Sequence, residues 1–402
     1  MRVIHIVRAN ITVERFLLPI LREQLKRGHD VDLAIGELDG PATYCGITAR
    51  RFDLPRAVSP LALARSLVYL RRLMQGNRYD AVLAHMLLAG FVGRVAAATA
   101  SEGQVAYVCH AFGFYPARRM HIRAAYRLWE VGLSLLTDSI VVLNEHDWDY
   151  VRCSRFAFRN VDKYKLRSVG VDGSKLLEEI GGTDPAAKKT ELGLARDARV
   201  VTFVGRFIKE KGILRFLRIA EDFPADESVH FVIVGDGPLR DEVVRGVGHL
   251  KVQGRVHVLG WREDVPQILA MSDVVCLPSE NEGSSVVLQE AMVCGAAIVA
   301  SRVPGCVDVI EHGETGLLVE LENIGGYVNG IRSLLENEGL AASLKESARR
   351  VARSTFDCSV VAPEWARTIE RIAERKKHST KTLRVLKCIR SVAGRTGTGR
   401  FS

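Results

Sequence analysis

The chain has 402 residues, of which 47% are hydrophobic and 26% charged, so it can form two folded domains and is neither disordered nor fibrous. Its eight scattered cysteines include no C-x-x-C pair, which argues against a structural zinc site or a disulfide framework and fits a reducing compartment. The segment 375–402 has nine Lys or Arg residues and no acid, so it accounts for the whole net charge of +9 and leaves the body near neutral.

The amino terminus leads directly into an apolar strand, so no secretory leader is expected. No apolar run reaches the roughly 20 residues that a membrane-spanning helix needs. We therefore expect a cytoplasmic protein, either soluble or peripheral at the inner face of the membrane.

Short apolar strands alternate with helical stretches through the first half of the chain. The first strand, 3–7, precedes an amphipathic helix at 13–27, and the stretch 161–176 is polar and irregular, as in a linker. Further strands are expected at 31–35, 81–84, 105–109 and 139–143. Continuous apolar strands separated by helices predict a parallel sheet covered on both faces.

A second series of strands, each followed by a helix, begins near residue 200. Its members are expected at 200–204, 230–234, 256–259, 274–277, 297–300 and 316–319. Two successive series of similar size predict two doubly wound α/β domains, whose ligands bind beyond the carboxyl ends of the strands in a cleft between the domains. The expected divisions are an N-terminal domain at 1–165, a linker at 166–185, a C-terminal domain at 186–352, a helix at 353–374 returning to the N-terminal domain, and the basic tail at 375–402.

Two loops of the second series carry glycines and cations at strand ends. In G-R-F-I-K-E-K-G, 205–212, Gly205 lets the chain turn, and Arg206 and Lys211 suit a diphosphate whose charge grows as it leaves, although a solvated basic loop would look the same. In V-G-D-G-P, 234–238, Arg240 occupies the place of the third glycine of a dinucleotide fingerprint. This second loop therefore predicts a tight turn near the ligand, and a dehydrogenase is not expected.

The third loop, S-E-N-E-G-S-S-V-V-L-Q-E-A at 279–291, is the most informative. Gly283, Ser284 and the next serine place backbone amides ahead of a helix that should start near residue 286, an end that binds anions. Glu282 lies before that helix and Glu290 lies within it. The two carboxylates can hold hydroxyls of a nucleotide sugar, or they merely suit the amino-terminal region of a helix.

Together these segments resemble the retaining glycosyltransferases of family 4, which have the GT-B fold of two Rossmann-like domains facing a central cleft. The resemblance covers residues 200–319 and includes L-G-W-R-E-D-V and P-G-C-V-D-V-I-E-H-G-E-T-G-L-L-V in the order typical of the family. It implies a metal-independent transferase without a cofactor that uses a nucleoside-diphosphate sugar, by preference a UDP-sugar.

The resemblance also implies roles for individual residues of the second half. Arg206 and Lys211 would bind the donor diphosphate, Glu282 the donor sugar and Glu290 the ribose hydroxyls. The amides of Gly283 and Ser284 would line the pocket, and the backbone of Gly260, Trp261 and Arg262 would contact the base. Because configuration is retained, Glu282 is not assigned as a nucleophile, and the departing phosphate can take the acceptor proton.

The first half is less similar to the family. Its first loop has Arg8, Asn10 and Thr12 where family members carry glycines, and these three side chains are candidates for the acceptor side. The segment H-A-F-G-F-Y at 110–115 resembles that of capsule and exopolysaccharide glycosyltransferases, which implies that His110 contacts the donor sugar near the reacting carbon. His85, also at a strand end, is a further candidate.

The acceptor is expected to be a glycan or a polyprenyl-diphosphate-linked molecule. The basic and aromatic stretch 114–129, with Arg118 and Arg119, either meets an anionic membrane surface or forms an ordinary solvated helix. The basic tail has the same alternatives, and no other feature supports nucleic acid binding. Two D-x-D matches, at Asp30 and Asp147, are interpreted as incidental rather than as a metal site.

Two other functions stay open. A sugar-nucleotide epimerase on the same fold would isomerise the donor without an acceptor. A catalytically silent sugar-nucleotide-binding protein would also keep the fold, but the intact Glu282, Glu290, Arg206 and Lys211 argue against it.

Overall fold

The structure, a computed structural model, divides the chain into two compact units. The first unit is Met1–Leu166 together with the chain from Ala362 onward, and the second is Arg167–Val361. The residues that the structure describes are 1–37, 39–54, 59–100, 103–224, 226, 228–249 and 253–375.

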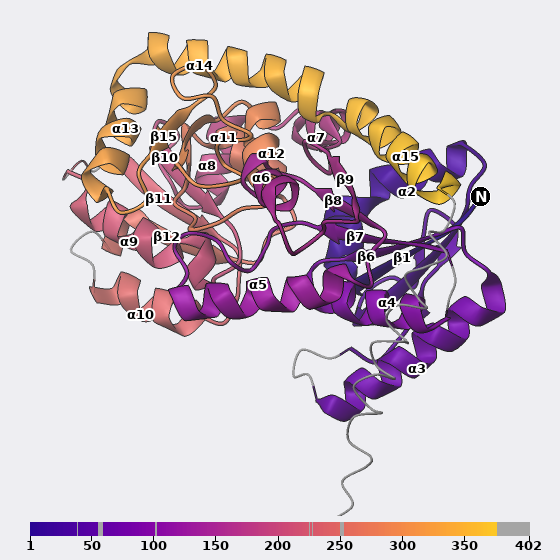
Figure 1. The fold of residues 1–402 in the computed structure, drawn as a ribbon. Coiled ribbons are helices and arrows are strands. Elements are labelled where there is room, and N and C mark those ends of the chain that lie inside the picture. Colours follow the sequence, from indigo (N-terminus) through magenta and orange to yellow (C-terminus); the bar gives the residue numbers. More distant parts are fainter. Residues whose placement is uncertain are drawn as a thin grey trace, which may run out of the picture. The chain divides into compact units, whose positions relative to one another are not determined.

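The first unit contains a parallel sheet of seven strands in the order β5-β2-β1-β6-β7-β8-β9. Figure 1 labels β1, β6, β7, β8 and β9 of this sheet. The strands are β1 Arg2–Ala9, β2 Asp30–Glu37, β5 Arg50–Arg51, β6 Ala81–His85, β7 Gln104–Cys109, β8 Ser139–Val142 and β9 Asp162–Lys165. A small antiparallel hairpin is formed by β3 Thr43–Tyr44 and β4 Ile47–Thr48. The central strands are buried on both faces, as their continuous apolar sequences predict.

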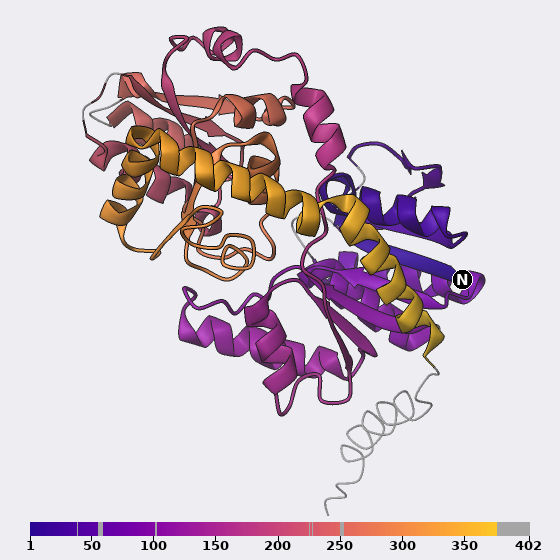
Figure 2. The same ribbon diagram turned by 90° about the horizontal axis from the view of Figure 1, so that it is seen from above.

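Helical segments follow the strands of the first unit, and the last helix of the chain begins in the second unit and continues into the first. They are α1 Asn10–Thr12, the π-helical turn η1 Val13–Leu17, α2 Leu18–Lys26, α3 Pro60–Asn77, α4 Leu87–Ala100, α5 Met120–Ser134, α6 Glu145–Cys153 and α15 Cys358–Glu374. The end of α15 lies beside the end of α2 (Figure 2), where Glu370 accepts from Arg27 Nη1 and His29 Nε2, both at 3.2 Å. The last helix thus belongs with the first unit from Ala362 onward.

Two local features differ from the sequence expectations. No loop separates the first strand from its helix, because extended Ala9 leads directly into helical Asn10, and no glycine is present to make a left-handed turn. The expected irregular stretch 161–176 contains β9, and the expected linker 166–185 contains helix α7, Gly173–Ile180. The strand was missed because β9 is a half-buried edge strand and therefore needs no continuous apolar sequence.

The second unit contains a parallel sheet of six strands in the order β12-β11-β10-β13-β14-β15. The strands are β10 Arg199–Val204, β11 Val229–Val234, β12 Val256–Gly260, β13 Val274–Leu277, β14 Ala297–Ser301 and β15 Leu317–Val319, all near their expected positions. Beside α7, the helical segments are α8 Pro185–Glu191, η2 Lys209–Lys211, α9 Ile213–Asp222, α10 Arg240–His249, η3 Gln253–Arg255, α11 Val265–Met271, α12 Val286–Cys294, α13 Ile324–Glu336, α14 Glu338–Val351 and η4 Ala352–Phe356.

Both sheets change winding direction beside their first strand. In the second unit β10 lies between β11 and β13, and in the first unit β1 lies between β2 and β6. A sheet of this topology binds ligands beyond the carboxyl ends of the strands at such a switch point. The loops after β10 and β13, and the side chains near the ends of β1 and β6, therefore lie where this topology binds ligands.

Candidate functional site

The loop after β10 touches the loop after β13 because a glycine permits a very close approach. Gly212 has φ +73°, and a Cβ atom there would lie 1.9 Å from the carbonyl oxygen of Pro278. Glu280 N donates to the carbonyl oxygen of Glu210 at 2.8 Å across the same junction. Lys211 ends a 3-10 turn at this point, and Arg206 is exposed on the same loop. Both cations therefore lie at the switch point of the second sheet.

The turn 235–237 supports this loop from the side of β11. Gly235 has φ +135°, and a Cβ atom there would lie 1.9 Å from the carbonyl oxygen of Gly205. Phe207 N donates to the carbonyl oxygen of Asp236 at 2.9 Å, and Gly235 N donates to that of Gly260 at 2.8 Å. The tight turn expected from V-G-D-G-P is thus present, and its glycines serve close backbone packing.

Glu282 and Lys211 form an ion pair. Lys211 Nζ donates to both carboxylate oxygens of Glu282, at 2.8 and 2.7 Å, and Ser279 Oγ donates to Oε1 at 2.8 Å. Glu282 is 6% exposed. Its backbone N–H donates to the carbonyl oxygen of Pro304 at 3.2 Å, and Gly305, with φ +77°, allows this turn to lie against Glu282. The carboxylate is therefore held by side chains from two loops, and the backbone of Glu282 is fixed by a third.

Helix α12 begins with backbone amides that no side chain among the described residues caps. Its N-cap residue, Ser285, is extended and makes no side-chain capping bond, so the first amides of the helix are available to an anion. The preceding turn is fixed by Gln289, which donates from Nε2 to Ser284 Oγ at 2.8 Å and accepts from Ser168 Oγ at 2.7 Å. Glu290 is nearly buried in the second turn of the helix.

Sequence reasoning assigned no role to Gln289, Ser279 or Gly305. A polar Gln289 inside an apolar helix, just after a Gly-Ser turn, was the signal in the sequence that could have indicated its role. Its partner Ser168, however, lies 121 positions away in the chain. The contacts of Ser279 and Gly305 also depend on how three loops meet, which the sequence does not show.

The residues expected to contact the base lie at the carboxyl end of β12 and directly after it. Trp261 is 58% exposed. The guanidinium of Arg262 donates to both oxygens of Asp264, at 2.7 and 2.6 Å, and this partner holds the pKa of Asp264 well below its usual value. The side chain of Arg262 is thus engaged, while Gly260 to Arg262 as a backbone contact for the base stays a prediction.

In the first unit, three histidines from adjacent strands lie in contact. His5 lies on β1, His85 ends β6 and His110 follows β7. His5 Nδ1 is 3.1 Å from His85 Nε2, and His85 Nδ1 is 3.4 Å from His110 Nε2. Met86, immediately after His85, has φ +61°, which is unusual for a residue with a side chain and indicates local backbone strain. The structure thus brings His85 and His110 together and adds His5.

These imidazoles are neutral near pH 7. Burial lowers the pKa of His5 and of His110 to about 4. Burial, with a smaller contribution from its two histidine neighbours, lowers the pKa of His85 well below its usual value. Each ring therefore has one N–H donor and one lone-pair acceptor.

The turn that follows His110 is anchored by Asp147. Phe112 N donates to Asp147 Oδ2 at 3.2 Å, and Asn144 Nδ2 donates to the same oxygen at 3.0 Å. In the other D-x-D match, Asp32 lies near the start of β2 and accepts from Tyr79 Oη at 2.6 Å. Both acids thus have structural partners. No cluster of three or more His, Cys, Asp or Glu side chains suited to a metal ion occurs among the described residues.

The acceptor-side candidates of the first loop are largely engaged within the unit. Asn10 is 3% exposed and donates from Nδ2 to the carbonyl oxygen of Pro41 at 3.0 Å and to Tyr44 Oη at 2.5 Å. Thr12 is equally buried, and Arg8 lies 3.6 Å from Glu37. Contact of any of these three side chains with an acceptor stays a prediction.

The basic and aromatic stretch 114–129 is not uniformly exposed. Phe114 and Tyr115 are buried, so these two aromatic rings are not available to a membrane surface. Arg118 lies over the rings of Tyr115 and Tyr126, at 4.8 and 5.2 Å, whereas Arg119 is exposed.

The exposed apolar residues of this region are on α5 and just after it. They are Met120 at 82%, Leu128 at 74%, Trp129 at 44% and Leu135 at 63% exposure. No helix within the described ranges combines the length and the apolar character needed to cross a bilayer. The basic tail from residue 376 onward lies outside the described residues.

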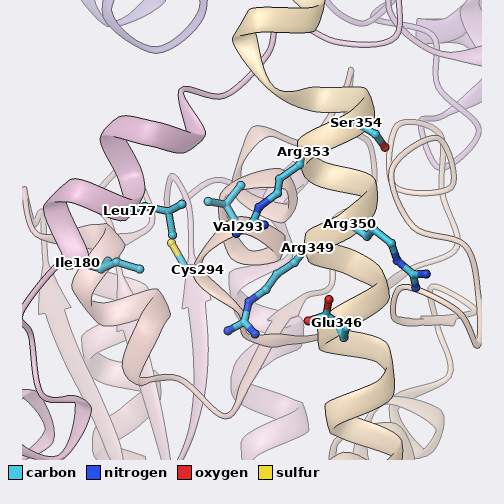
Figure 3. A pocket seen from close by; sticks show the side chains of 9 residues that line it. All are labelled: Leu177, Ile180, Val293, Cys294, Glu346, Arg349, Arg350, Arg353 and Ser354. Atoms are coloured by element: carbon cyan, nitrogen blue, oxygen red, sulfur yellow. The ribbon is translucent and has the colours of Figure 1, made fainter.

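A separate cavity of about 520 Å³ lies in the second unit near the carboxyl-terminal end of α12 (Figure 3). Its lining residues are Leu177, Ile180, Val293, Cys294, Glu346, Arg349, Arg350, Arg353 and Ser354. Arg349 covers Gly295, the left-handed residue that ends α12. The uncapped amides of α12 are at the opposite end of this nine-residue helix, roughly 13 Å away at 1.5 Å per residue. This cavity is therefore distinct from the loops at the switch point.

Two family models match the chain. Residues 185–351 match the model described as glycosyl transferases group 1, and residues 12–162 match the glycosyl transferase 4-like domain. Together they cover most of both units.

Two bacterial enzymes are similar along most of their length. A UDP-Gal:α-D-GlcNAc-diphosphoundecaprenol α-1,3-galactosyltransferase of Escherichia coli is 30% identical over 331 residues, 80% of this chain and 84% of that protein. An N,N'-diacetylbacillosaminyl-diphospho-undecaprenol α-1,3-N-acetylgalactosaminyltransferase of Campylobacter jejuni is 24% identical over 92% of this chain and 99% of that protein.

Solved structures agree on the fold. HepE of Anabaena, in complex with UDP and glucose, has a TM-score of 0.75 at 20% identity and covers 92% of this chain and 100% of its own. A sucrose-phosphate synthase of Thermosynechococcus elongatus has a TM-score of 0.78 at 19% identity over 92% of this chain and 99% of its own. At these identities the likeness shows the two-domain GT-B fold.

Proposed function

This chain belongs to the family 4 glycosyltransferases of the GT-B fold, and from that membership we propose its donor, acceptor and mechanism. The donor is a nucleoside-diphosphate sugar, with a UDP-sugar favoured, and the acceptor is a glycan or a polyprenyl-diphosphate-linked sugar of cell-surface polysaccharide synthesis. The names of the two bacterial relatives, whose acceptors are sugars on diphosphoundecaprenol, support this acceptor class.

One observation carries the proposal: two cations and an uncapped helix start lie together at the switch point of the second sheet. Lys211 reaches Glu282 from the loop after β10, and α12 starts just after the loop that holds Glu282. Negative charge develops on the diphosphate as it leaves the anomeric carbon. Lys211, Arg206 and the α12 amides therefore stabilise the transition state more than the ground state.

The proposed reaction breaks the bond between the anomeric carbon and the phosphate oxygen and forms a bond to the acceptor oxygen on the same face, with retention of configuration. The departing phosphate takes the acceptor proton. Glu282 binds the donor sugar, and its ion pair with Lys211 orients both side chains. Glu290 holds the ribose hydroxyls, and His110 contacts the donor sugar.

A lipid-linked acceptor would be met at an anionic membrane surface. The exposed apolar side chains Met120, Leu128 and Leu135, together with the exposed cation Arg119, support α5 as the contacting segment. Apolar side chains entering the interface and cations near anionic headgroups both favour such binding.

The proposal is tested by measuring thermal stabilisation and hydrolysis with a panel of nucleotide sugars. We expect UDP-sugars to stabilise the protein and Glu290→Ala to remove that stabilisation while the unliganded melting temperature stays near that of the wild type. Donor isomerisation without an acceptor would instead identify an epimerase. Binding without turnover toward any diphosphate-linked acceptor would identify a silent binding protein.

A further inference from the structure

A continuous line of hydrogen bonds runs from helix α2 through the first sheet to His110. Gln24 Oε1 is 2.8 Å from His5 Nε2, and the line continues through the His5–His85 and His85–His110 contacts described above. Gln24 and His5 have no exposed surface, and His85 is 1% exposed. Water therefore does not interrupt the line, and each of its members depends on the next for its hydrogen bond.

With Oε1 of the Gln24 amide facing His5 Nε2, one direction follows for every hydrogen bond in this line. Oε1 only accepts, so His5 Nε2 carries the hydrogen atom and His5 Nδ1 has the lone pair. His85 Nε2–H then donates to His5, which leaves a lone pair on His85 Nδ1. His110 Nε2–H donates to that lone pair. The second nitrogen of His110, Nδ1, is consequently an acceptor.

Two further observations indicate that this line of hydrogen bonds orients His110. Although His110 is largely buried, its Nδ1 makes no hydrogen bond to any residue that the structure describes, so this nitrogen has no partner within that part of the chain. At the inner end, Gln24 Nε2 is buried without a hydrogen-bond partner. Burying the unpaired Nε2 donor of Gln24 costs free energy. If Gln24 only filled space, an apolar residue of the same size would avoid this cost, so the glutamine indicates a role for its acceptor oxygen.

We propose that Gln24 is a positioning residue that, through His5 and His85, holds His110 in the Nε2–H tautomer and directs its Nδ1 lone pair at a hydroxyl of the donor sugar. This inference rests on the proposed role of His110 in binding that sugar. The line transmits orientation and tautomer only, and none of its members needs to gain or lose a proton during transfer.

Kinetics of three purified variants test this proposal. Gln24→Met removes the acceptor at similar length and should lower kcat roughly 10- to 100-fold, by analogy with the loss of partners that orient metal-bound histidines. The KM for the nucleotide sugar should change little. Gln24→Glu keeps an acceptor oxygen and should retain most of the activity. Ile20→Val, one turn earlier on the same buried face of α2, should lower the melting temperature without lowering kcat.

A spectroscopic measurement separates a change of tautomer from a general loosening. In protein labelled with ¹⁵N-histidine, the His110 signals, identified by their absence from His110→Ala, should show Nε2 protonated and Nδ1 bare in the wild type and in Gln24→Glu. Gln24→Met should show a mixture of tautomers. A wild-type His110 with Nδ1 protonated, wild-type kcat in Gln24→Met, or an equal loss of kcat in Ile20→Val would overturn the proposal.

The same assay keeps this inference apart from the proposed function. If His110→Ala transfers sugar normally, the proposed role of His110 is wrong and the positioning role fails with it. If His110→Ala is inactive while Gln24→Met has wild-type kcat, His110 acts as proposed and only the role of Gln24 is refuted.

Discussion

Substituting Lys211 with alanine removes both the cation proposed for the diphosphate and the partner of Glu282. The carboxylate of Glu282, 6% exposed, would keep the single hydroxyl of Ser279 as a side-chain donor. Breaking a fully buried ion pair costs about 3–5 kcal/mol, and an exposed pair contributes about 0–1 kcal/mol. The side chain of Lys211 is 29% exposed, so the pair lies between these limits.

We therefore expect Lys211→Ala to lower the free energy of unfolding of the second unit by about 2 kcal/mol. For a unit of this size, that corresponds to a melting temperature about 4 to 8 °C lower. The protein should remain folded, since a domain commonly has about 5–15 kcal/mol of stability. The rate of transfer should fall on the order of 100- to 1,000-fold, because the site loses one preorganised positive charge that stabilises the leaving diphosphate.

Differential scanning calorimetry and a donor-hydrolysis assay measure the two effects on the same protein. The double variant Lys211→Ala with Glu282→Gln should recover part of the lost melting temperature, because the uncompensated buried charge is gone, but should recover no activity. Turnover like that of the wild type in Lys211→Ala would refute the donor site. An unchanged melting temperature would refute the energetic reasoning on the ion pair.

Three further predictions concern other parts of the molecule. Gly305→Ala should reduce transfer and lower the free energy of unfolding by about 1–2 kcal/mol or more. The reason is that Gly305 has φ +77° and that a Cβ atom there would lie 2.3 Å from the carbonyl oxygen of Glu282. Kinetics measures the first effect and urea unfolding the second. The pKa of His5 is about 4 in the folded protein and 6.5 in the unfolded chain, so the unfolded chain binds the proton first as the pH falls. His5 should therefore lower the free energy of unfolding by about 2 kcal/mol between pH 8 and pH 5. Urea unfolding should show a smaller loss over this pH range in His5→Gln. Leu128→Asp, at a residue of α5 that is 74% exposed, should weaken sedimentation with vesicles of anionic lipid while leaving donor hydrolysis unchanged.

Matched controls exist for two of these substitutions. Gly313→Ala introduces similar backbone strain at φ +82° with no neighbouring atom within 4 Å of the new Cβ, so it should leave transfer intact. Phe156→Asp places the same charge at a residue 82% exposed outside α5 and should not affect vesicle binding. Equal effects of a substitution and its control would contradict the explanation given for it.

The expected strands of both series are present in the structure. They could be predicted because a short, continuous apolar run between helical patterns is typical of a buried parallel strand. The six strands of the second unit illustrate this, since they all begin within one residue of their expected starts. The edge strand β9 escaped prediction because only half of its surface is buried. Its sequence, D-K-Y-K, therefore resembles a loop.

The donor residues could be named from the sequence because the loop 279–291 carries Glu282, Glu290 and the helix start within one short segment. The spacing of residues along a single helix and its preceding turn follows from local geometry. That Lys211 bonds Glu282 could not be read in the same way, because the two residues are 71 positions apart and meet only when β10 and β13 pair.

The amino-acid sequence alone determined which segments are strands and which are helices, through the spacing of their apolar residues. It also determined which short loops at strand ends carry charged residues and glycines. The line from Gln24 through His5 and His85 was decided by tertiary structure alone. A hydrogen bond requires atoms about 3 Å apart. For residues 80 positions apart, as for His5 and His85, that distance is reached only through the register of neighbouring strands, β1 beside β6, which no local pattern encodes.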